Sequence, residues 1–256
     1  MEIKSISAFI TGGASGIGAA TARFLLSKGA HVTVMDANSE RLSAVLAEFG
    51  ERANGFAGDV TNPGDVNSAL EAATTWPLPL RVAINCAGIG HADRILQKDG
   101  SPHSLETFER VIRVNLIGTF NVLRLSSGVI SRMPVLEGGE RGVIINTASI
   151  AAFDGQIGQA AYASSKGAVV SLTLPAARDL ASVGIRVACI APGIIDTPLL
   201  GQLPGEVRDR LAREVPFPKR LGLPEDYAVV AEMIIRSSYI NGEVIRVDGA
   251  LRMSPK

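Results

Sequence analysis

The sequence is poor in the features that mark several classes of protein. It has only two cysteines, Cys86 and Cys189, and both sit in apolar runs, so buried, inert thiols are expected in place of a disulfide framework. Basic and acidic residues balance at 25 each without a long run of Lys or Arg, which argues against a nucleic-acid partner. No apolar stretch reaches the roughly 20 residues of a membrane span, so membrane insertion is not expected.

Metal-binding patterns and targeting segments are also missing. The three histidines, His31, His91 and His103, show no metal-ligand spacing, and no metal site is predicted. The first expected strand begins near Ile6, which leaves no room for a cleavable presequence, so a cytoplasmic location is the default expectation. A length of 256 residues and a hydrophobic fraction of 46% fit a single domain with a large core.

Short apolar runs alternate with amphipathic stretches along the whole chain. This pattern predicts an α/β fold: one doubly wound domain of the Rossmann type, with a seven-stranded parallel sheet covered by helices on both faces. Strands are expected at residues 8–11, 31–36, 55–58, 82–86, 143–147, 185–190 and 244–247. Helices are expected at 16–28, 40–49, 63–75, from 105 towards 133, at 160–180 and at 206–214. The last of these lies in a Pro- and Gly-rich segment, about 194–220, that is expected to form a substrate lid.

A glycine-rich turn follows the first expected strand and opens the first helix. It reads Thr11-Gly12-Gly13-Ala14-Ser15-Gly16-Ile17-Gly18. Glycine lets a backbone turn sharply and approach a pyrophosphate held at a helix N-terminus, although it also serves ordinary tight turns. We predict that a dinucleotide cofactor is held here by Gly12, Ser15, Gly16, Ile17 and Gly18.

Asp36 ends the second expected strand, close to the offset of about 20 residues at which an acid accepts the ribose hydroxyls of NAD. The 2′-phosphate of NADP would meet a like charge there, and neither Ser15 nor Ala37 offers a basic side chain. The sequence therefore favours NAD. The alternative is that Asp36 caps the helix that starts near Glu40.

Tyr162 and Lys166 are spaced i, i+4 in an expected helix, which places the phenol and the ammonium on one face, about 5–6 Å apart at Cβ. A phenol in water ionises near pH 10, and a fixed cation beside it favours the phenolate needed by a general base at neutral pH. The same spacing is common on solvated helix faces, so the neighbouring residues decide between the two interpretations.

Ser149 follows the expected strand at 143–147, at the edge where open parallel sheets bind their ligands. Its hydroxyl is expected to hydrogen-bond a substrate oxygen on which charge develops. A hydrolase nucleophile is not indicated, because no Gly-x-Ser-x-Gly elbow surrounds Ser149 and no histidine completes a triad.

Taken in order, these residues resemble a known family, the short-chain dehydrogenases/reductases, over essentially the whole chain. The resemblance rests on Thr11-Gly12-x-x-x-Gly16-x-Gly18, Asn85-Cys86-Ala87-Gly88, Ser149, Tyr162-x-x-x-Lys166 and Pro192-Gly193. It implies hydride transfer between a nicotinamide and a secondary alcohol or ketone, with Tyr162 as general acid/base and Lys166 holding the nicotinamide ribose. It also implies that Ser149 orients the carbonyl and that Asn115 holds a water in the proton relay.

The resemblance implies further contacts. Cofactor contacts are expected from Asp59, Val60, Asn85, Ala87, Gly88, Tyr162, Lys166, Pro192, Gly193, Ile195 and Thr197. Substrate contacts are expected from Ser149, Gln159 and Tyr162.

Residues 141–167, 215–218 and 241–253, with the loop at 91–104, resemble a branch of the family that oxidises 3-hydroxyacyl-CoA and tolerates steroid alcohols. This likeness implies an acyl-CoA or steroid-like alcohol as substrate and a homotetramer, and the preference for NAD rests on Asp36. The alternatives are a hydroxysteroid or other alcohol dehydrogenase, a 3-oxoacyl carrier-protein reductase that uses NADPH, and a non-catalytic nucleotide-binding scaffold. Asp36 argues against the reductase, and the intact set of catalytic residues argues against the scaffold.

Overall fold

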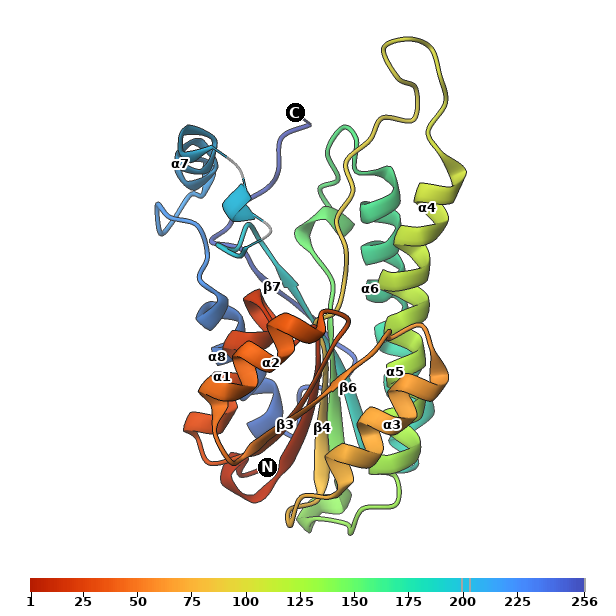
Figure 1. The fold of residues 1–256 in the computed structure, drawn as a ribbon, viewed down its shortest axis with the longest axis vertical. Helices are drawn as coiled ribbons and strands as arrows, with labels where there is room; N and C mark the ends of the chain where they lie inside the picture. Colours follow the sequence, from red (N-terminus) through yellow and green to blue (C-terminus); the bar gives the residue numbers. More distant parts are fainter. Residues whose placement is uncertain (199, 203, 256) are drawn as a thin grey trace.

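A seven-stranded parallel sheet forms the centre of the computed structural model, which describes residues 1–198, 200–202 and 204–255 (Figure 1). The strand order is β3-β2-β1-β4-β5-β6-β7, and every pairing is parallel. The strands are β1 (Ser7–Thr11), β2 (His31–Asp36), β3 (Ala53–Ala57), β4 (Leu80–Asn85), β5 (Gly142–Thr147), β6 (Ile185–Pro192) and β7 (Val244–Val247). The predicted doubly wound α/β fold is confirmed.

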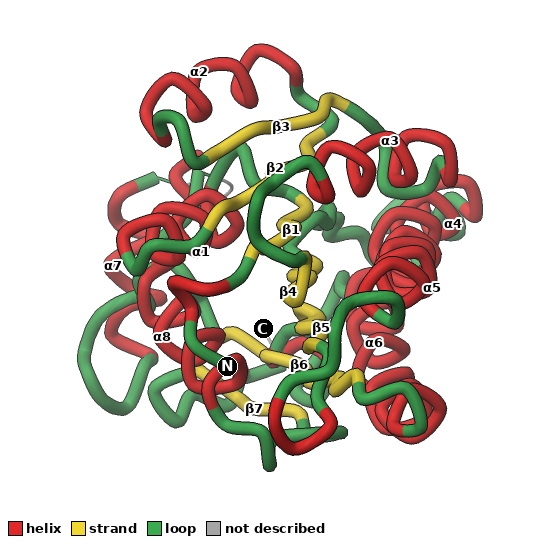
Figure 2. Tube along the Cα trace, turned by 90° about the horizontal axis from the view of Figure 1, so that it is seen from below, coloured by secondary structure: helices red, strands yellow, loops and turns green. Residues whose placement is uncertain are grey.

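Helices cover both faces of the sheet (Figure 2). One face carries α1 (Gly16–Ser27), α2 (Ser39–Phe49) and α8 (Pro224–Arg236), and the other carries α3 (Pro63–Thr74), α4 (Leu105–Ile112), α5 (Thr119–Ile130) and α6 (Ala160–Ala181). Along β1, Ala8 and Ile10 pack into the first core and Phe9 into the second, all fully buried. A strand buried on both faces is predominantly apolar, which explains the near-continuous apolar runs in the sequence.

The helix α8 was missed by the sequence analysis, which assigned no helix between the lid and the last strand. Its start carries an ordinary signal, with Pro224 at the first position and the acids Glu225 and Asp226 in the first turn. Its apolar face packs mainly against α1, from the opposite end of the chain. The helix therefore completes the cover of the first face and brings Tyr227 to the sheet.

The expected lid contains η5 (Leu200–Gln202) and α7 (Gly205–Glu214), and residues 199 and 203 of this segment lie outside the described residues. An ion pair between Arg208 and Asp196, with an N···O distance of 2.6 Å, ties α7 back to the chain that leaves β6. The lid and the single domain stay predictions. None of the described helices combines the length and the apolar character needed to cross a membrane.

Candidate active site

A cleft of about 480 Å³ opens at the carboxyl ends of the central strands. This is the edge at which parallel α/β sheets bind ligands, because the loops that follow the strands leave a crevice there. The structure brings a large part of the predicted site together around this cleft. The predicted residues that line it are Gly12, Ser15, Gly16, Ile17, Gly18, Asp36, Asp59, Val60, Ala87, Gly88, Tyr162, Lys166, Pro192 and Thr197.

The glycine-rich turn forms a cradle in which Gly12 and Gly18 have no room for a side chain, because the chain's own backbone lies against them. A Cβ at Gly12, where φ is +64°, would lie 2.8 Å from the Cα of Ala87, and a Cβ at Gly18 would lie 2.2 Å from the carbonyl oxygen of Gly12. Ser15 is the N-cap of α1, makes no side-chain capping hydrogen bond, and precedes a first turn without acidic residues. The backbone amides at this helix N-terminus are therefore suited to a phosphate, and the cradle fits a dinucleotide.

Asp36 lines the same cleft. Its carboxylate accepts hydrogen bonds from the backbone amides of Ala14, at 3.1 Å, and Asn38, at 2.9 Å. The N-cap of α2 is Asn38, whose side chain accepts from the amide of Arg41 at 2.8 Å, so the alternative that Asp36 caps this helix is wrong. Arg41 also lines the cleft, and the sequence analysis did not identify it.

Lys166 is held in a defined place beside Tyr162. Its side chain is buried, its Nζ donates to the backbone oxygen of Thr147 at 2.8 Å, and this Nζ lies 5.8 Å from the centre of the Tyr162 ring. A solvated helix face would leave the lysine in water, so that interpretation of the spacing is wrong. The pair instead places a fixed cation next to a phenol in the cleft.

A polar cluster packs against the side chain of Thr147. The hydroxyl of Tyr227 lies 2.8 Å from Oγ1 of Thr147, and the Sγ of Cys86 lies 3.8 Å from that Oγ1. Desolvation raises the pKa of Tyr227 well above its ordinary value and that of Cys86 to about 11, so both groups stay neutral. Cys86 lines the cleft and is partly exposed, which corrects the expectation that it is fully buried, whereas Cys189 is buried as expected. Thr147 and Tyr227 were not identified from the sequence.

Ser149 is buried next to Ala148, which lines the cleft. It is the N-cap of the short helix η4 (Ile150–Ala152), and its Oγ accepts a hydrogen bond from the amide of Ala151 at 3.1 Å. Because this contact uses a lone pair, the hydroxyl hydrogen of Ser149 stays free to be donated.

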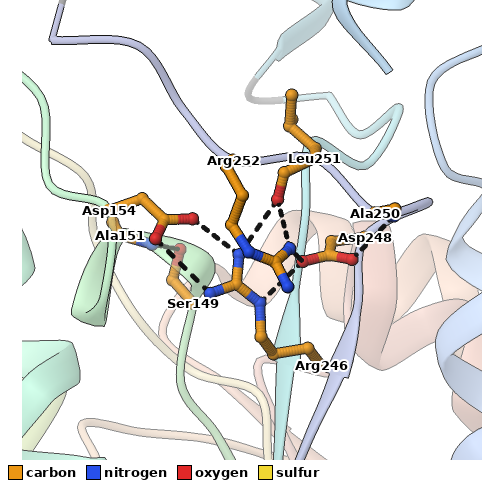
Figure 3. A network of polar contacts seen from close by, with 8 residues as sticks. All are labelled: Ser149, Ala151, Asp154, Arg246, Asp248, Ala250, Leu251 and Arg252. Atoms are coloured by element: carbon orange, nitrogen blue, oxygen red, sulfur yellow. Dashed lines mark hydrogen bonds and ion pairs between the residues drawn. The ribbon is translucent and has the colours of Figure 1, made fainter. Parts of the chain in front are cut away.

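The segment that begins at Ser149 is anchored at its far end by a network of charges (Figure 3). Arg246 of β7 donates to Asp154 at 2.6 Å and to Asp248 at 2.7 Å, and the backbone oxygen of Leu251 accepts from it at 3.0 Å. The hydrogen bond from Arg246 holds the pKa of Asp154 below its ordinary value. The loop that positions Ser149 is thus fastened to the last strand and to the C-terminal segment.

Asn115 lies in a π-helical turn, η2 (Arg113–Gly118), that joins α4 to α5 within the predicted long helix. Its fully buried amide accepts from the backbone nitrogen of Ile89 at 2.8 Å and donates to the oxygen of Ile89 at 2.9 Å. It also donates to Ser165, whose hydroxyl donates to the backbone oxygen of Tyr162. Widened helical turns of this kind often occur at functional sites. Here the Asn115 side chain holds Ile89, which lines the cleft.

Some predicted site residues lie away from the described lining of the cleft. Asn85 is buried and donates to Asn146 at 2.9 Å between the ends of β4 and β5. Gln159 pairs with Gln156 beside a shallow hollow formed with residues 93–95. Gly193 and Ile195 line a separate cavity of about 300 Å³.

The short chain dehydrogenase family model matches residues 7–207. The chain is 51% identical over 255 residues to 3-hydroxyacyl-CoA dehydrogenase type-2 from Bos taurus, which covers 99% of this chain and 98% of that protein.

Two solved structures are similar along nearly the whole chain. The crystal structure of 3-hydroxyacyl-CoA dehydrogenase type-2 from Mycobacterium avium has a TM-score of 0.94 at 44% identity, covering 99% of this chain and 98% of its own. That of 3-ketoacyl-(acyl-carrier-protein) reductase from Brucella melitensis, complexed with NADH, has a TM-score of 0.83 at 30% identity, covering 97% and 98%.

Proposed function

The chain belongs to the short chain dehydrogenase family, and on this premise we propose that it oxidises the C3 hydroxyl of a 3-hydroxyacyl-CoA to a ketone with NAD. The buried Lys166, anchored on Thr147 beside Tyr162 in the cleft, is the observation that carries the proposal. The name of the relative from Bos taurus supports the acyl-CoA substrate, because the two chains are similar over nearly their full lengths.

A nicotinamide cofactor fits both the family and the cleft. A Cβ at Gly12 or Gly18 would collide with the chain's own backbone, so these glycines permit the tight turn that brings the N-terminus of α1 to the cleft, where the backbone would hold the pyrophosphate. Asp36 would accept the ribose hydroxyls, Asp59 and Val60 would contact the adenine, and Lys166 would hold the nicotinamide ribose. When bound, the nicotinamide supplies the acceptor for the hydride that leaves C3 of the substrate.

The proton leaves through Tyr162 in the proposed mechanism. Its phenolate takes the proton of the substrate hydroxyl while the C3 hydride departs, so that one hydride and one proton convert the alcohol to the ketone. The ammonium of Lys166, fixed by the Thr147 oxygen, stabilises the negative charge on the phenolate. Asn115 keeps Ile89 and the start of α6 in place and would hold the water that relays the proton away.

Ser149 positions the reacting oxygen. Its Oγ is fixed by the amide of Ala151, which leaves the hydroxyl hydrogen to be donated to the substrate oxygen. Such a preorganised donor stabilises charge that develops on this oxygen during hydride transfer. Gln159, the N-cap residue of α6, would contact the acyl portion of the substrate.

The cofactor preference should follow the charge at Asp36. Replacing Asp36→Ala together with Ala37→Arg is expected to shift the ratio of kcat/KM for NAD over NADP by about tenfold or more towards NADP. The physical reason is that a hydrogen bond to a charged group is worth about 1.5–3 kcal/mol, and its loss is joined here by a new cation for the 2′-phosphate. Steady-state rates with each cofactor measure the ratio.

The single variant Ala37→Arg serves as the control for this switch. It adds the cation but keeps the carboxylate, so it should still prefer NAD. If the ratio of kcat/KM for NAD over NADP is unchanged in the double variant, Asp36 does not determine the cofactor preference. Arg41, which lines the same cleft, would then be the next residue to test.

The substrate class is tested by NADH formation with purified protein. We expect turnover with 3-hydroxybutyryl-CoA and NAD at an efficiency well above that with a 17β-hydroxysteroid, with 2-methyl-3-hydroxybutyryl-CoA as a further acyl substrate and no substrate as the blank. Activity only with NADP would favour a 3-oxoacyl carrier-protein reductase. Activity only on a non-CoA alcohol would discard the acyl-CoA substrate, and no turnover on any alcohol would favour a non-catalytic nucleotide-binding scaffold.

We also propose that the chain assembles as a homotetramer, as the resemblance to the 3-hydroxyacyl-CoA-oxidising branch of the family implies. The large apolar side chains of Phe120 on α5 and Leu174 on α6 are both 45% exposed in the isolated chain, which is consistent with a partner copy on these helices. The cytoplasmic location stays a prediction.

A further inference from the structure

The base of the loop at residues 91–104 brings together possible metal ligands that the sequence separates. His91 and Asp93 follow β4 and His103 precedes α4, at the two ends of the loop that joins these elements (Figure 1). One ligand atom from each lies within 4.8 Å of the others, and all three residues are partly buried. No metal site was expected from the sequence, because the histidines lack metal-ligand spacing. The fold of this loop nevertheless brings His91 and His103 together with Asp93.

Two of the three candidate ligands, His103 and Asp93, already form a hydrogen bond with another protein group. Nδ1 of His103 lies 2.7 Å from the backbone oxygen of Ser104. A carbonyl can only accept, so the proton sits on Nδ1 and Nε2 keeps its lone pair in the neutral ring. For Asp93, the side chain of Gln97 donates to Oδ1, which leaves Oδ2, at 3.9 Å from Nε2 of His91. Outer contacts of this kind fix the orientation of metal ligands.

The remaining geometry and charge favour a cation at this position. Asp93 contributes the one carboxylate of the cluster. The backbone amide of Asp93 donates to the oxygen of Gly158 at 2.7 Å, which fixes the residue against the chain that leads into α6. The rings of His91 and His103 meet edge to face at 6.0 Å between their centres.

We propose that His91, Asp93 and His103 bind a divalent transition-metal cation of the Zn²⁺ class at the base of this loop. Two imidazoles and one carboxylate suit such a cation, and water would complete its coordination. Tetrahedral Zn²⁺ with ligand bonds of about 2.1 Å holds its ligand atoms about 3.4 Å apart, so the ligand atoms, now within 4.8 Å of one another, would have to approach by at most about 1.4 Å on binding.

The proposed metal site acts as a clip that joins the two ends of the loop. It does not include the residues that carry out hydride transfer. Residues 91 and 103 lie at opposite ends of the loop, so a shared cation closes it and restricts its motion. Through Asp93 and Gly158 the clip also steadies the segment that precedes Tyr162. Its occupancy therefore orders one wall beside the proposed active site.

Metal binding is measured by calorimetric titration of the tag-free, chelator-treated full-length protein with Zn²⁺, and by visible absorption with Co²⁺. We expect about one equivalent per chain, and His91→Ala and His103→Ala should each weaken the affinity by at least about tenfold. Asp93→Asn should also weaken binding. The matched control is Asp99→Asn, which removes the same charge from the exposed tip of the same loop and should leave the affinity unchanged.

Limited trypsin digestion gives an independent readout. Arg94 and Lys98 are exposed in this loop, and Zn²⁺ should slow cleavage after them in the native protein but not in His103→Ala, as followed by mass spectrometry. Zn²⁺ binding that survives both histidine variants would indicate an adventitious ion only, and the absence of stoichiometric binding would equally overturn the proposal. Both readouts are separate from NADH formation, so failure here leaves the proposed dehydrogenase function standing.

Discussion

Replacing Tyr162 by Phe is expected to lower kcat by about 10²- to 10⁴-fold, which is the usual contribution of a positioned general acid/base. The phenylalanine keeps the ring in the cleft but removes the oxygen that takes the substrate proton. Lys166 keeps its hydrogen bond to Thr147, so binding of NADH should change little. Initial rates of NADH formation and a fluorescence titration of NADH separate these two effects.

Tyr239→Phe provides the matched control, because Tyr239 is 99% exposed and removal of its hydroxyl should leave both kcat and NADH affinity unchanged. The proposed mechanism is contradicted if Tyr162→Phe retains kcat within about threefold of the native enzyme. A parallel loss of NADH binding would point to a disturbed cleft as the cause, and the titration detects that case directly.

The sequence predicted the strands well where both faces of a strand are fully buried. The inner strands β1, β4 and β5 are fully buried, and their apolar runs predicted them within about two residues. The edge strand β3 is only half-buried, and Asn54 within it accepts a hydrogen bond from Thr33, so its sequence signal is weak. Its predicted start fell at residue 55, two residues after the observed one.

The candidate site was predictable where side chains carry the chemistry. The motifs with Gly12, Asp36 and Tyr162 follow different strands, and parallel strands present their carboxyl ends at one edge, so the structure gathers them around one cleft. Contacts made by backbone atoms leave no such signature. The carbonyl of Thr147 that accepts from Lys166 is an example, and it could not be read from residue types.

The cluster of His91, Asp93 and His103 was missed for a related reason. Its members meet only because the loop doubles back, with the amide of His103 donating to the oxygen of Ile95 at 2.9 Å. A search by fixed ligand spacing cannot find a site that depends on the path of an irregular loop.

Replacing Arg246 by Met is expected to lower the free energy of unfolding by about 1–3 kcal/mol at neutral pH. Breaking a fully buried ion pair costs about 3–5 kcal/mol, and the side chains of Arg246 and Asp154 keep 20% and 16% of their surface exposed, which reduces the cost. The substitution leaves the carboxylates of Asp154 and Asp248 near each other without their shared cation. Urea denaturation measures the loss.

The pH dependence of this loss identifies its cause. Because the native pKa of Asp154 lies below that of the unfolded chain, its stabilising contribution is present above the ordinary carboxyl pKa, about 3.9, and is lost as the pH falls through the native value. The difference in stability between the native protein and Arg246→Met should therefore narrow as the pH falls below about 4. A difference that stays constant with pH would argue that lost packing, rather than the ion pair, destabilises the variant.

Arg252→Met is the control within the same network, since Arg252 also contacts Asp248 but its side chain is 60% exposed. Exposed pairs are worth at most about 1 kcal/mol, so this variant should remain close to the native stability. Arg246→Met should in addition lower kcat more than it raises the KM for NAD, because Asp154 anchors the loop that begins at Ser149 and not the cofactor cradle. Equal effects of the two substitutions on stability and kcat would show that Arg246 has no special part in holding that loop.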